Sequence, residues 1–385
     1  MEEGVYLFEP GVHNGTEALH TSQSDVPASC DAVDEDFLYE RFYMAVIAGG
    51  SVATVSIVTN TFLFFLFVTN RQHRNSYNLY MLLLAFFDVF LSISYCALMA
   101  VRVLTNWTGS YALRKMWMSY MIPMLTISHI AQTASVYLIV FAAVERFCIT
   151  LNTRAVQLLQ RNRCLLATVA VMCGVFPKST IPLEIQITYN ETCFGHFNEF
   201  GLMPGKIVHA HLYEYWRLWF RNIFTIVFPF LVLFMLNLLL CGVEVRLRQA
   251  VATGANGAVM GDKQNARIRA ATRTLSIIVL THLMSNLLSM VITVWEMFDP
   301  ASLWTPTFMP FYILSVDAIS ILPIVACSLR LPIYASCQPL LRAEMIQFIA
   351  QSCVKKKMSR RATIIETQHM GQGLLAGREP AGDQV

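Results

Sequence analysis

Residues 134–147 read ASVYLIVFAAVERF, a mostly apolar run that ends in the charged pair Glu145-Arg146. The run belongs to a longer apolar segment over 117–149. A helix needs only about 20 such residues to cross the hydrocarbon core of a bilayer. Charges next to this core are costly. We therefore expect a membrane-spanning helix that leaves the bilayer at Glu145 and Arg146.

The rest of the chain repeats this pattern. Of its 385 residues, 55% are hydrophobic and 14% charged, whereas soluble domains carry about 25% charged residues. The alternating pattern of a membrane β-barrel is absent. We predict an all-α membrane protein, a bundle of seven transmembrane helices. The predicted spans are 43–68, 77–101, 117–149, 164–182, 217–247, 269–297 and 309–335.

Charge predicts the orientation. Residues 1–42 contain ten acidic residues against a single cation, Arg41, and no apolar signal-peptide region. Lysine and arginine gather in the segments that an extracellular N-terminus would place inside, as cytoplasmic loops do. The three glycosylation sequons, at Asn14, Asn106 and Asn190, fall in segments that this topology places outside. We expect an extracellular N-terminus and a cytoplasmic C-terminus.

Three parts follow: an acidic outer tail over 1–42, a seven-helix domain over 43–335 and a cytoplasmic part over 336–385. Residues 338–350 are expected to form a short amphipathic helix along the inner leaflet. Cys353 beside three lysines is a palmitoylation candidate. Nothing in the pattern indicates a nucleic-acid partner.

A carboxylate, Asp88, lies midway through the second span. A charged group there costs about 2.5–3.5 kcal/mol on insertion scales and marks a functional site by default. Ser135 shares a helix face with Arg146, eleven residues later, and would meet Asp88 at mid-membrane depth. A carboxylate and a hydroxyl suit a sodium ion. The alternative is a neutral, hydrogen-bonded Asp88 that fixes helix packing.

Several motifs resemble those of rhodopsin-like G-protein-coupled receptors over about residues 42–342. They are Asn60 in the first span, Leu84-Ala85-x-x-Asp88 in the second, Glu145-Arg146-Phe147 in the third, Pro229 in the fifth and Pro332 in the seventh. Asn75-Ser76-Tyr77-Asn78 and Thr272-Arg273-Thr274-Leu275 resemble one branch, the invertebrate receptors for FMRFamide-like neuropeptides.

The resemblance implies a plasma-membrane receptor for an extracellular peptide. Glu145 would hold Arg146 at rest, and Arg146 would meet a heterotrimeric G protein on activation. Phe147 stands where relatives usually have tyrosine. Arrestin and receptor kinases are further implied partners, and Asn60 is expected to join Asp88 and Ser135 in a polar network.

The sixth and seventh spans depart from the family. The sixth has no proline, and in the seventh the usual Asn-Pro-x-x-Tyr reads Leu331-Pro332-Ile333-Tyr334. Arg330 precedes this motif, and we expect its long side chain to extend to the cytoplasmic interface.

The candidate ligand contacts follow from the same comparison. Ser128 stands where amine receptors have an aspartate, and the last span has no lysine for a Schiff base. Gln132 is a second candidate contact in the third span. Acids around the last outer loop could pair with a peptide's arginine, or could be solvated loop charges. These acids are Glu296, Asp299 and Asp317.

The cysteines depart from the family as well. Cys193 fits the second outer loop, but the outer end of the third span lacks its usual cysteine partner. Cys30 is the other outer candidate, and we hypothesise a Cys30–Cys193 disulfide because extracellular thiols tend to oxidise. Two unpaired thiols are the alternative.

Other classes of protein match less well. A transporter or channel would show internal repeats or several buried charges along a path, and an intramembrane enzyme would show a catalytic motif. Within the family, a chemosensory or weakly coupling receptor with a small-molecule ligand is the main alternative. No cofactor beyond the sodium ion is expected.

Overall fold

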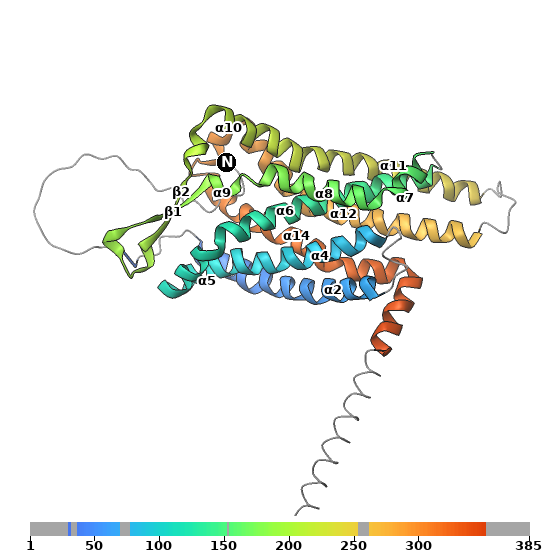
Figure 1. The fold of residues 1–385 in the computed structure, drawn as a ribbon, viewed down its shortest axis with the longest axis horizontal. Coiled ribbons are helices and arrows are strands. Elements are labelled where there is room, and N and C mark those ends of the chain that lie inside the picture. Colours follow the sequence, from blue (N-terminus) through green and yellow to red (C-terminus); the bar gives the residue numbers. More distant parts are fainter. Residues whose placement is uncertain (1–29, 32–36, 70–77, 152–153, 253–261, 352–385) are drawn as a thin grey trace, which may run out of the picture. The chain divides into compact units, whose positions relative to one another are not determined.

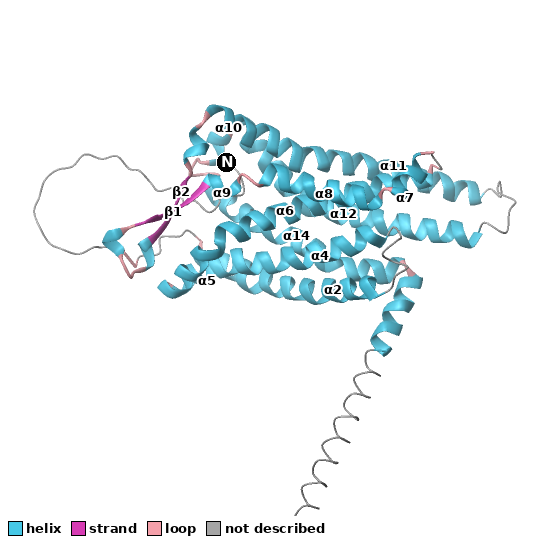
Figure 2. Cartoon of the chain, in the orientation of Figure 1, coloured by secondary structure: helices cyan, strands magenta, loops and turns pink. Residues whose placement is uncertain are grey.

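The computed structural model describes residues 30–31, 37–69, 78–151, 154–252 and 262–351 of the chain. These residues are almost all helical apart from one short hairpin (Figure 1; Figure 2). The chain divides into two compact units, Met1–Ile333 and Tyr334–Val385.

Among the described residues, seven helices are long and apolar enough to cross a membrane, which confirms that part of the prediction. The helix ends differ most from the prediction at the start of the fifth span and at the facing ends of the second and third spans. The helices there run through Arg102 and Arg114, because charge ends an apolar stretch but not a helix. The seven helices are Leu38–Thr69, Leu79–Thr108, Tyr111–Thr150, Arg163–Glu184, His211–Val243, Ala270–Phe298 and Met309–Cys337.

Three of these helices contain π-helical turns, which take up an extra residue and often lie at functional sites. The first helix comprises α1 (Leu38–Arg41), η2 (Phe42–Gly49, a π turn) and α2 (Gly50–Thr69). The second comprises α4 (Asn78–Tyr95), the π turn η3 (Cys96–Ala100) and α5 (Val101–Thr108). The fifth comprises α10 (His211–Tyr215), the π turns η7 (Trp216–Arg221) and η8 (Ile223–Val227), and α11 (Phe228–Ala252).

The third helix, α6 (Tyr111–Thr150), is central in unit 1: it contacts α4, α8 (Arg163–Lys178), α11 and α12 (Asp262–Phe298). Its buried residues Leu138 and Ile139 belong to a core cluster that also holds Leu84 of α4, Leu233 of α11 and Val279 of α12. The approach of α8 is close, because a Cβ at Gly174 would lie 2.6 Å from the carbonyl oxygen of Ile130. Small residues allow such close packing of membrane helices.

A hairpin follows the fourth helix. The short helix α9 (Ile181–Glu184) leads into β1 (Ile185–Tyr189), which pairs antiparallel with β2 (Phe200–Pro204), Ile187 lying opposite Leu202. Two short 3-10 turns, η4 (Glu191–Cys193) and η5 (Phe197–Glu199), form its tip, and η6 (Lys206–His209) leads on to α10. Ile185 and Phe200 pack with Leu98, Trp117 and Leu125 in a second core cluster. The hairpin is therefore fixed to the second and third helices.

The remaining elements complete unit 1. Helix α7 (Ala155–Arg161) joins α6 to α8, and α13 (Pro300–Leu303) joins α12 to α14 (Met309–Cys337). Helix α14 contains Pro323 and Pro332, whereas α12 has no proline and continues over 37 residues.

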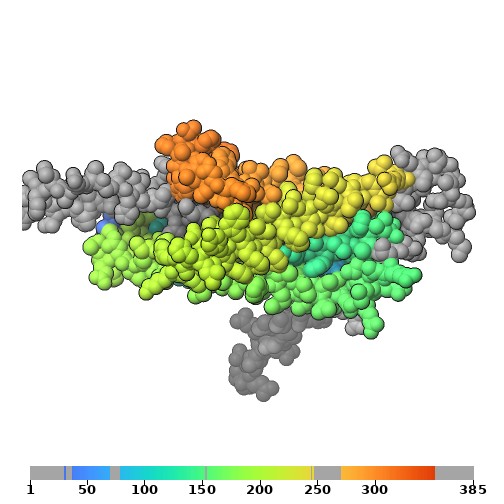
Figure 3. Space-filling model, turned by 90° about the horizontal axis from the view of Figure 1, so that it is seen from above, coloured from blue at the N-terminus to red at the C-terminus, as the bar shows by residue number. Residues whose placement is uncertain are grey.

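Apolar side chains cover the outward face of α11, which lies in the yellow-green band of Figure 3. In the most apolar stretch of 18 residues in the fifth helix, only 22% is buried inside the protein. Such a face is stable in lipid, where no polar group has to be solvated. The exposed side chains include Phe228, Leu231, Phe234, Met235 and Leu238.

The second unit contains a helix over residues 339–351, where the sequence predicted one. Its buried positions, Leu341 and Met345, are spaced four residues apart, which gives the helix an apolar face. Cys353 lies outside the described residues.

Candidate functional site

One cavity, here the Leu125 cavity, has a volume of roughly 110 Å³ and lies between the second, third and seventh helices. Ser128 and Gln132, both predicted as ligand contacts, line it. Its walls are largely aliphatic, and the π turn η3 contributes two side chains. The aliphatic residues include Leu91, Leu98, Met99, Leu125, Ile319 and Ile324.

A smaller cavity, here the Lys178 cavity, has a volume of roughly 40 Å³ and lies between the third, fourth, fifth and sixth helices. His129 and Gln132 line both cavities, so the two adjoin at these residues. Lys178 is only 6% exposed. The π turn η8 contributes Thr225 and Ile226. Sequence analysis did not find this cavity, because its residues come from four separate spans.

Two of the three acids predicted at a pocket mouth are buried instead. Asp317 is 1% exposed, and its Oδ2 lies 2.7 Å from Nε of Arg41. Glu296 is 5% exposed and accepts a hydrogen bond of 2.7 Å from the Tyr312 hydroxyl. Asp299 is exposed. That these acids face a ligand stays a prediction, and the carboxylates of Glu296 and Asp317 already bind partners within the protein.

Asp88 forms an ion pair with Arg330, whose Nη1 lies 2.7 Å from Oδ2 of the carboxylate. Asp88 is fully buried and Arg330 is 5% exposed. One prediction is thereby corrected, because Arg330 is buried beside Asp88 and does not extend to an interface. The sodium ion stays a prediction, and the carboxylate of Asp88 is already paired with the guanidinium of Arg330 on α14.

Asn60 joins the first helix to the seventh. Its amide nitrogen donates to the carbonyl oxygen of Cys327 at 3.1 Å and to that of Ser56 at 3.0 Å. The Ser92 hydroxyl of α4 lies 2.7 Å from that of Ser56. Asn60 is thus part of a polar network, whereas the hydroxyl of Ser135 has no hydrogen-bond partner among the described residues. The network links the first, second and seventh helices without Ser135.

The carboxylate of Glu145 binds Arg163 at the start of α8. Nε of Arg163 lies 3.0 and 3.1 Å from the two carboxylate oxygens, and its Nη2 donates to Oε1. Glu145 is 1% exposed and Arg146 6% exposed, while Phe147 is half-buried. Sequence analysis named Arg146 as the partner of Glu145 and missed Arg163, although both ends of this pair are charges at span boundaries. The release of Arg146 stays a prediction.

A further buried ion pair connects the fourth and fifth helices on the hairpin side. Arg221 Nη2 lies 2.9 Å from Oε2 of Glu184, and the hydroxyls of Thr180 and Tyr213 donate to Oε1 of the same carboxylate. Arg221 is 1% exposed. Sequence reasoning gave no signal for this pair, because an acid and an arginine near span ends are common.

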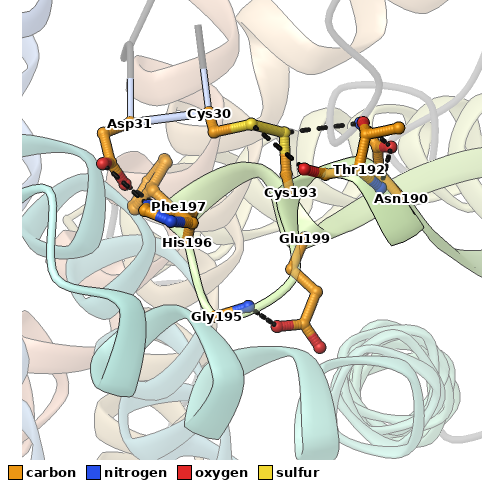
Figure 4. Close-up of a disulfide and its surroundings, with 9 residues drawn as sticks. All are labelled: Cys30, Asp31, Asn190, Thr192, Cys193, Gly195, His196, Phe197 and Glu199. Carbon is orange, nitrogen blue, oxygen red and sulfur yellow. Dashed lines mark hydrogen bonds and ion pairs between the residues drawn. A yellow bond between two sulfur atoms is a disulfide. The ribbon is translucent and has the colours of Figure 1, made fainter. Parts of the chain in front are cut away.

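The predicted disulfide between Cys30 and Cys193 is confirmed, with the two Cα atoms 5.3 Å apart. Figure 4 shows that it holds the chain before α1 against the tip of the hairpin. The amide of Asn198 donates to the carbonyl of Cys30 at 2.9 Å. Asp31 adds contacts of 3.0 Å to Nδ1 of His196 and 3.2 Å to the amide of Phe197. The bond is therefore one of several contacts at this point.

Hydrogen bonds stabilise two ionised carboxylates at the hairpin. The contact with His196, together with the Phe197 amide, holds the pKa of Asp31 below its usual range. The amide of Gly195 and the Tyr111 hydroxyl, each 2.8 Å from Oε2, lower the pKa of Glu199. Each carboxylate is an acceptor in its charged form, which explains both shifts.

The three sequons differ in the structure. Asn190 is exposed and its side chain accepts from the amide of Thr192 at 3.2 Å. Asn106 is 5% exposed, and its oxygen lies 3.5 Å from Nη1 of Arg114. Asn14 lies outside the described residues. A glycan needs an accessible amide, so the structure disagrees with the prediction at Asn106.

No protein-family model matches this chain, and no curated protein matches it.

Proposed function

We propose that this chain is a rhodopsin-like G-protein-coupled receptor of the plasma membrane, a seven-helix bundle with an extracellular N-terminus and a cytoplasmic C-terminus. The observation that carries the proposal is the layout of α6. Gln132 of α6 lines both cavities. Glu145, thirteen residues after Gln132 on the same helix, binds Arg163 of α8. At 1.5 Å per residue, the two sites are about 20 Å apart. One rigid element thus joins a cavity to a charged contact at its other end.

The charged contact suits a switch. An ion pair between α6 and α8 holds Glu145 at rest, and opening of the helices would exchange this partner for another. Arg146, next along the chain, would then meet the heterotrimeric G protein. Arrestin and receptor kinases would act on the same face.

The cavities favour a small-molecule ligand. Glu296 and Asp317 are bound to Tyr312 and Arg41, so they no longer offer carboxylates to the arginine of a peptide. The two cavities hold roughly 110 and 40 Å³, enough for a compact molecule or the end of a longer one. A ligand there would touch four or more helices and bias their packing.

A neuropeptide, FMRFamide-like or related, is the second candidate, and the hairpin favours it. Among the described residues β1 and β2 pair only with each other, so each strand has an outer edge. An extended peptide can add to such an edge through main-chain hydrogen bonds.

The test is expression in cells with promiscuous G proteins, with surface delivery measured by an antibody tag. Both an RFamide peptide library and a library of small organic molecules are applied, and G-protein activation is read out. We expect activation by at least one compound and its loss in Arg146→Ala. A surface-delivered chain that activates no G protein with either library, or a response unchanged in Arg146→Ala, would contradict the proposal. Ligand-dependent uptake or current would favour a transporter or channel.

A further inference from the structure

Neutral polar groups lie where the two cavities adjoin. Gln132 of α6 lines both cavities, and Ser128, about one turn earlier on the same helix, lines the Leu125 cavity. Neither side chain forms a hydrogen bond with any described residue. A side-chain amide offers two N–H donors and a carbonyl acceptor, and a hydroxyl both donates and accepts. Polar groups within membrane segments are costly and usually serve a function, so we ask which ligand these two match.

A third unpartnered group lines the Lys178 cavity. The hydroxyl of Thr225, on the π turn η8, is buried without a hydrogen-bond partner among the described residues, and the residue is 5% exposed. Other hydroxyls in the walls are already bonded. That of Thr133 donates to the carbonyl oxygen of His129 at 3.0 Å. That of Ser320 donates to the carbonyl oxygen of Val316 at 3.1 Å. A buried polar group without a partner costs free energy, and a ligand that supplies the partner offsets this cost.

The walls do not indicate a charged ligand. None of the described lining residues of either cavity is an aspartate or glutamate, so a cationic ligand would find no carboxylate there. The two cations of the walls, Arg102 and Lys178, both interact with other groups of the protein. Burying an ionised group without a partner is costly. The unpartnered groups, on Ser128, Gln132 and Thr225, are neutral, and they match a neutral ligand.

The Leu125 cavity indicates what the rest of the ligand is. Eight of its fifteen described lining residues are aliphatic, methionine or proline. Tyr95 adds an aromatic ring, while its hydroxyl donates to the carbonyl oxygen of Ala45 in the first helix at 2.9 Å. An apolar group gains free energy by leaving water for such a surface. A molecule with a neutral polar head and an apolar part therefore matches the two cavities together.

We propose that the two cavities bind a neutral organic carboxamide, whose amide group forms hydrogen bonds with Gln132 and Thr225 and whose apolar part lies in the Leu125 cavity. A primary carboxamide carries the same donors and acceptor as the Gln132 side chain, so the two amides can pair through two hydrogen bonds. That this carboxamide is an activating ligand rests on the proposed receptor function, whereas its binding does not.

The experiment measures binding by titration calorimetry on the full chain in lipid nanodiscs, with empty nanodiscs as the blank. The probes are 3-phenylpropionamide, 3-phenylpropionate and 4-phenylbutan-2-one. The ketone has a methyl group in place of the NH₂, so it keeps the shape and the acceptor and loses both donors. Leaving a buried acceptor unpaired costs roughly tenfold in affinity. We expect the amide to bind about tenfold more tightly than the ketone, and the carboxylate to bind no more tightly than the amide. Equal binding of amide and ketone, tighter binding of the carboxylate, or no binding of the amide would overturn the inference.

Variants locate the amide of the ligand. Gln132→Met should reduce the preference for amide over ketone to within about twofold, and Thr225→Val should weaken amide binding severalfold. Each has a matched control that should change nothing. Gln157→Met removes an exposed glutamine on α7, and Thr133→Val removes a hydroxyl of the same cavity that is bonded to its own helix. A preference that survives Gln132→Met, or an equal effect of Thr133→Val and Thr225→Val, would refute the assignment.

The melting temperature of each variant separates folding from binding. Thr225→Val removes a hydroxyl that has no partner among the described residues, so it should not lower the melting temperature, and its weaker binding then reports a lost ligand contact. If Gln132→Met does not fold, Thr225→Val and Ser128→Ala carry the test. Amide binding unchanged in both would count against the site.

Two further comparisons identify the source of the carboxamide and its role. The amidated end of a peptide has the same group, so Arg-Phe-amide is titrated beside the dipeptide acid. The walls offer no acid to its arginine, and we expect Arg-Phe-amide to bind more weakly than 3-phenylpropionamide. Tighter binding would contradict a small neutral ligand and assign the site to a peptide end. Amide binding without G-protein activation would contradict the proposed function and leave this inference intact, whereas activation by other compounds without amide binding would do the reverse.

Discussion

The ion pair between Asp88 and Arg330 gives the sharpest prediction, because both side chains are almost completely buried and 2.7 Å apart. The perturbation is a double-mutant cycle of Asp88→Asn, Arg330→Met and the combination. Each single change leaves one charge inside the protein without its partner, whereas the combination removes both charges.

The magnitude follows from the burial. Two unit charges about 4 Å apart attract by about 4 kcal/mol at an effective dielectric constant of about 20. Breaking a buried pair by removing one partner costs about 3–5 kcal/mol, while removing both is often close to neutral. For Arg330→Met the loss has an upper limit, because protonating an aspartate at pH 7 costs about 4 kcal/mol from its pKa in water. At pH 5 this limit falls to about 1.5 kcal/mol.

The assay is unfolding by denaturing detergent in mixed micelles, which gives the free energy of unfolding of each variant. We expect Asp88→Asn to lose about 3–5 kcal/mol and Arg330→Met about 3–4 kcal/mol at pH 7. Arg330→Met should recover part of its loss at pH 5, and the double variant should lose the least. Asp299→Asn, at an exposed acid, should stay within about 0.5 kcal/mol of the unmodified chain. Exchanging sodium for choline at constant ionic strength should not shift the midpoint. Additive losses, or stabilisation by sodium, would refute the reasoning.

Three further predictions concern the two ends of the helices. Peptide mapping without reductant should recover the disulfide-linked pair of peptides, and Cys193→Ser should lower the melting temperature; two alkylatable thiols in the untreated chain would exclude the bond. Glu145→Gln should raise ligand-independent G-protein activation because it releases Arg163, and Glu145→Asp should raise it less; equal basal activity in all three would remove the switch role. The lowered pKa of Asp31 means that its contact with His196 stabilises the fold above the ordinary pKa of 3.8 and is lost as the pH falls below it. Hydrogen-exchange protection at the hairpin tip, corrected for the intrinsic rate, should therefore decrease below about pH 4, with little pH dependence in Asp31→Asn.

Hydropathy alone predicted the seven helices, because a stretch of about 20 apolar residues that can cross a bilayer is recognised from its own composition. Helix ends were predicted less well where charge lies inside a helix, as at Arg102 and Arg114. The disulfide could be inferred because only two cysteines, Cys30 and Cys193, were expected outside the membrane. These predictions need only local composition and a topology.

The partners of buried charges could not be predicted in the same way. Arg330 was expected to reach water, since a long cation near the end of a span usually can, yet Asp88 lies closer. Asp317 and Arg41 are 276 residues apart. The local sequence around either residue does not determine which other helix it packs against. The two cavities depend on the same long-range packing. Only the side-by-side placement of helices shows that Gln132 lines both.

The disulfide between Cys30 and Cys193 also restricts the possible membrane topology of the chain. Four of the seven long helices lie between the two cysteines. Each crossing reverses the side of the membrane, so the cysteines share a side only after an even number of crossings. If the fourth segment, which Pro177 and Lys178 interrupt, failed to insert, the thiols would lie on opposite sides and could not react. The bond therefore checks the insertion of the first four helices, and because disulfides persist in oxidising compartments, it favours a lumenal or extracellular position for residue 30.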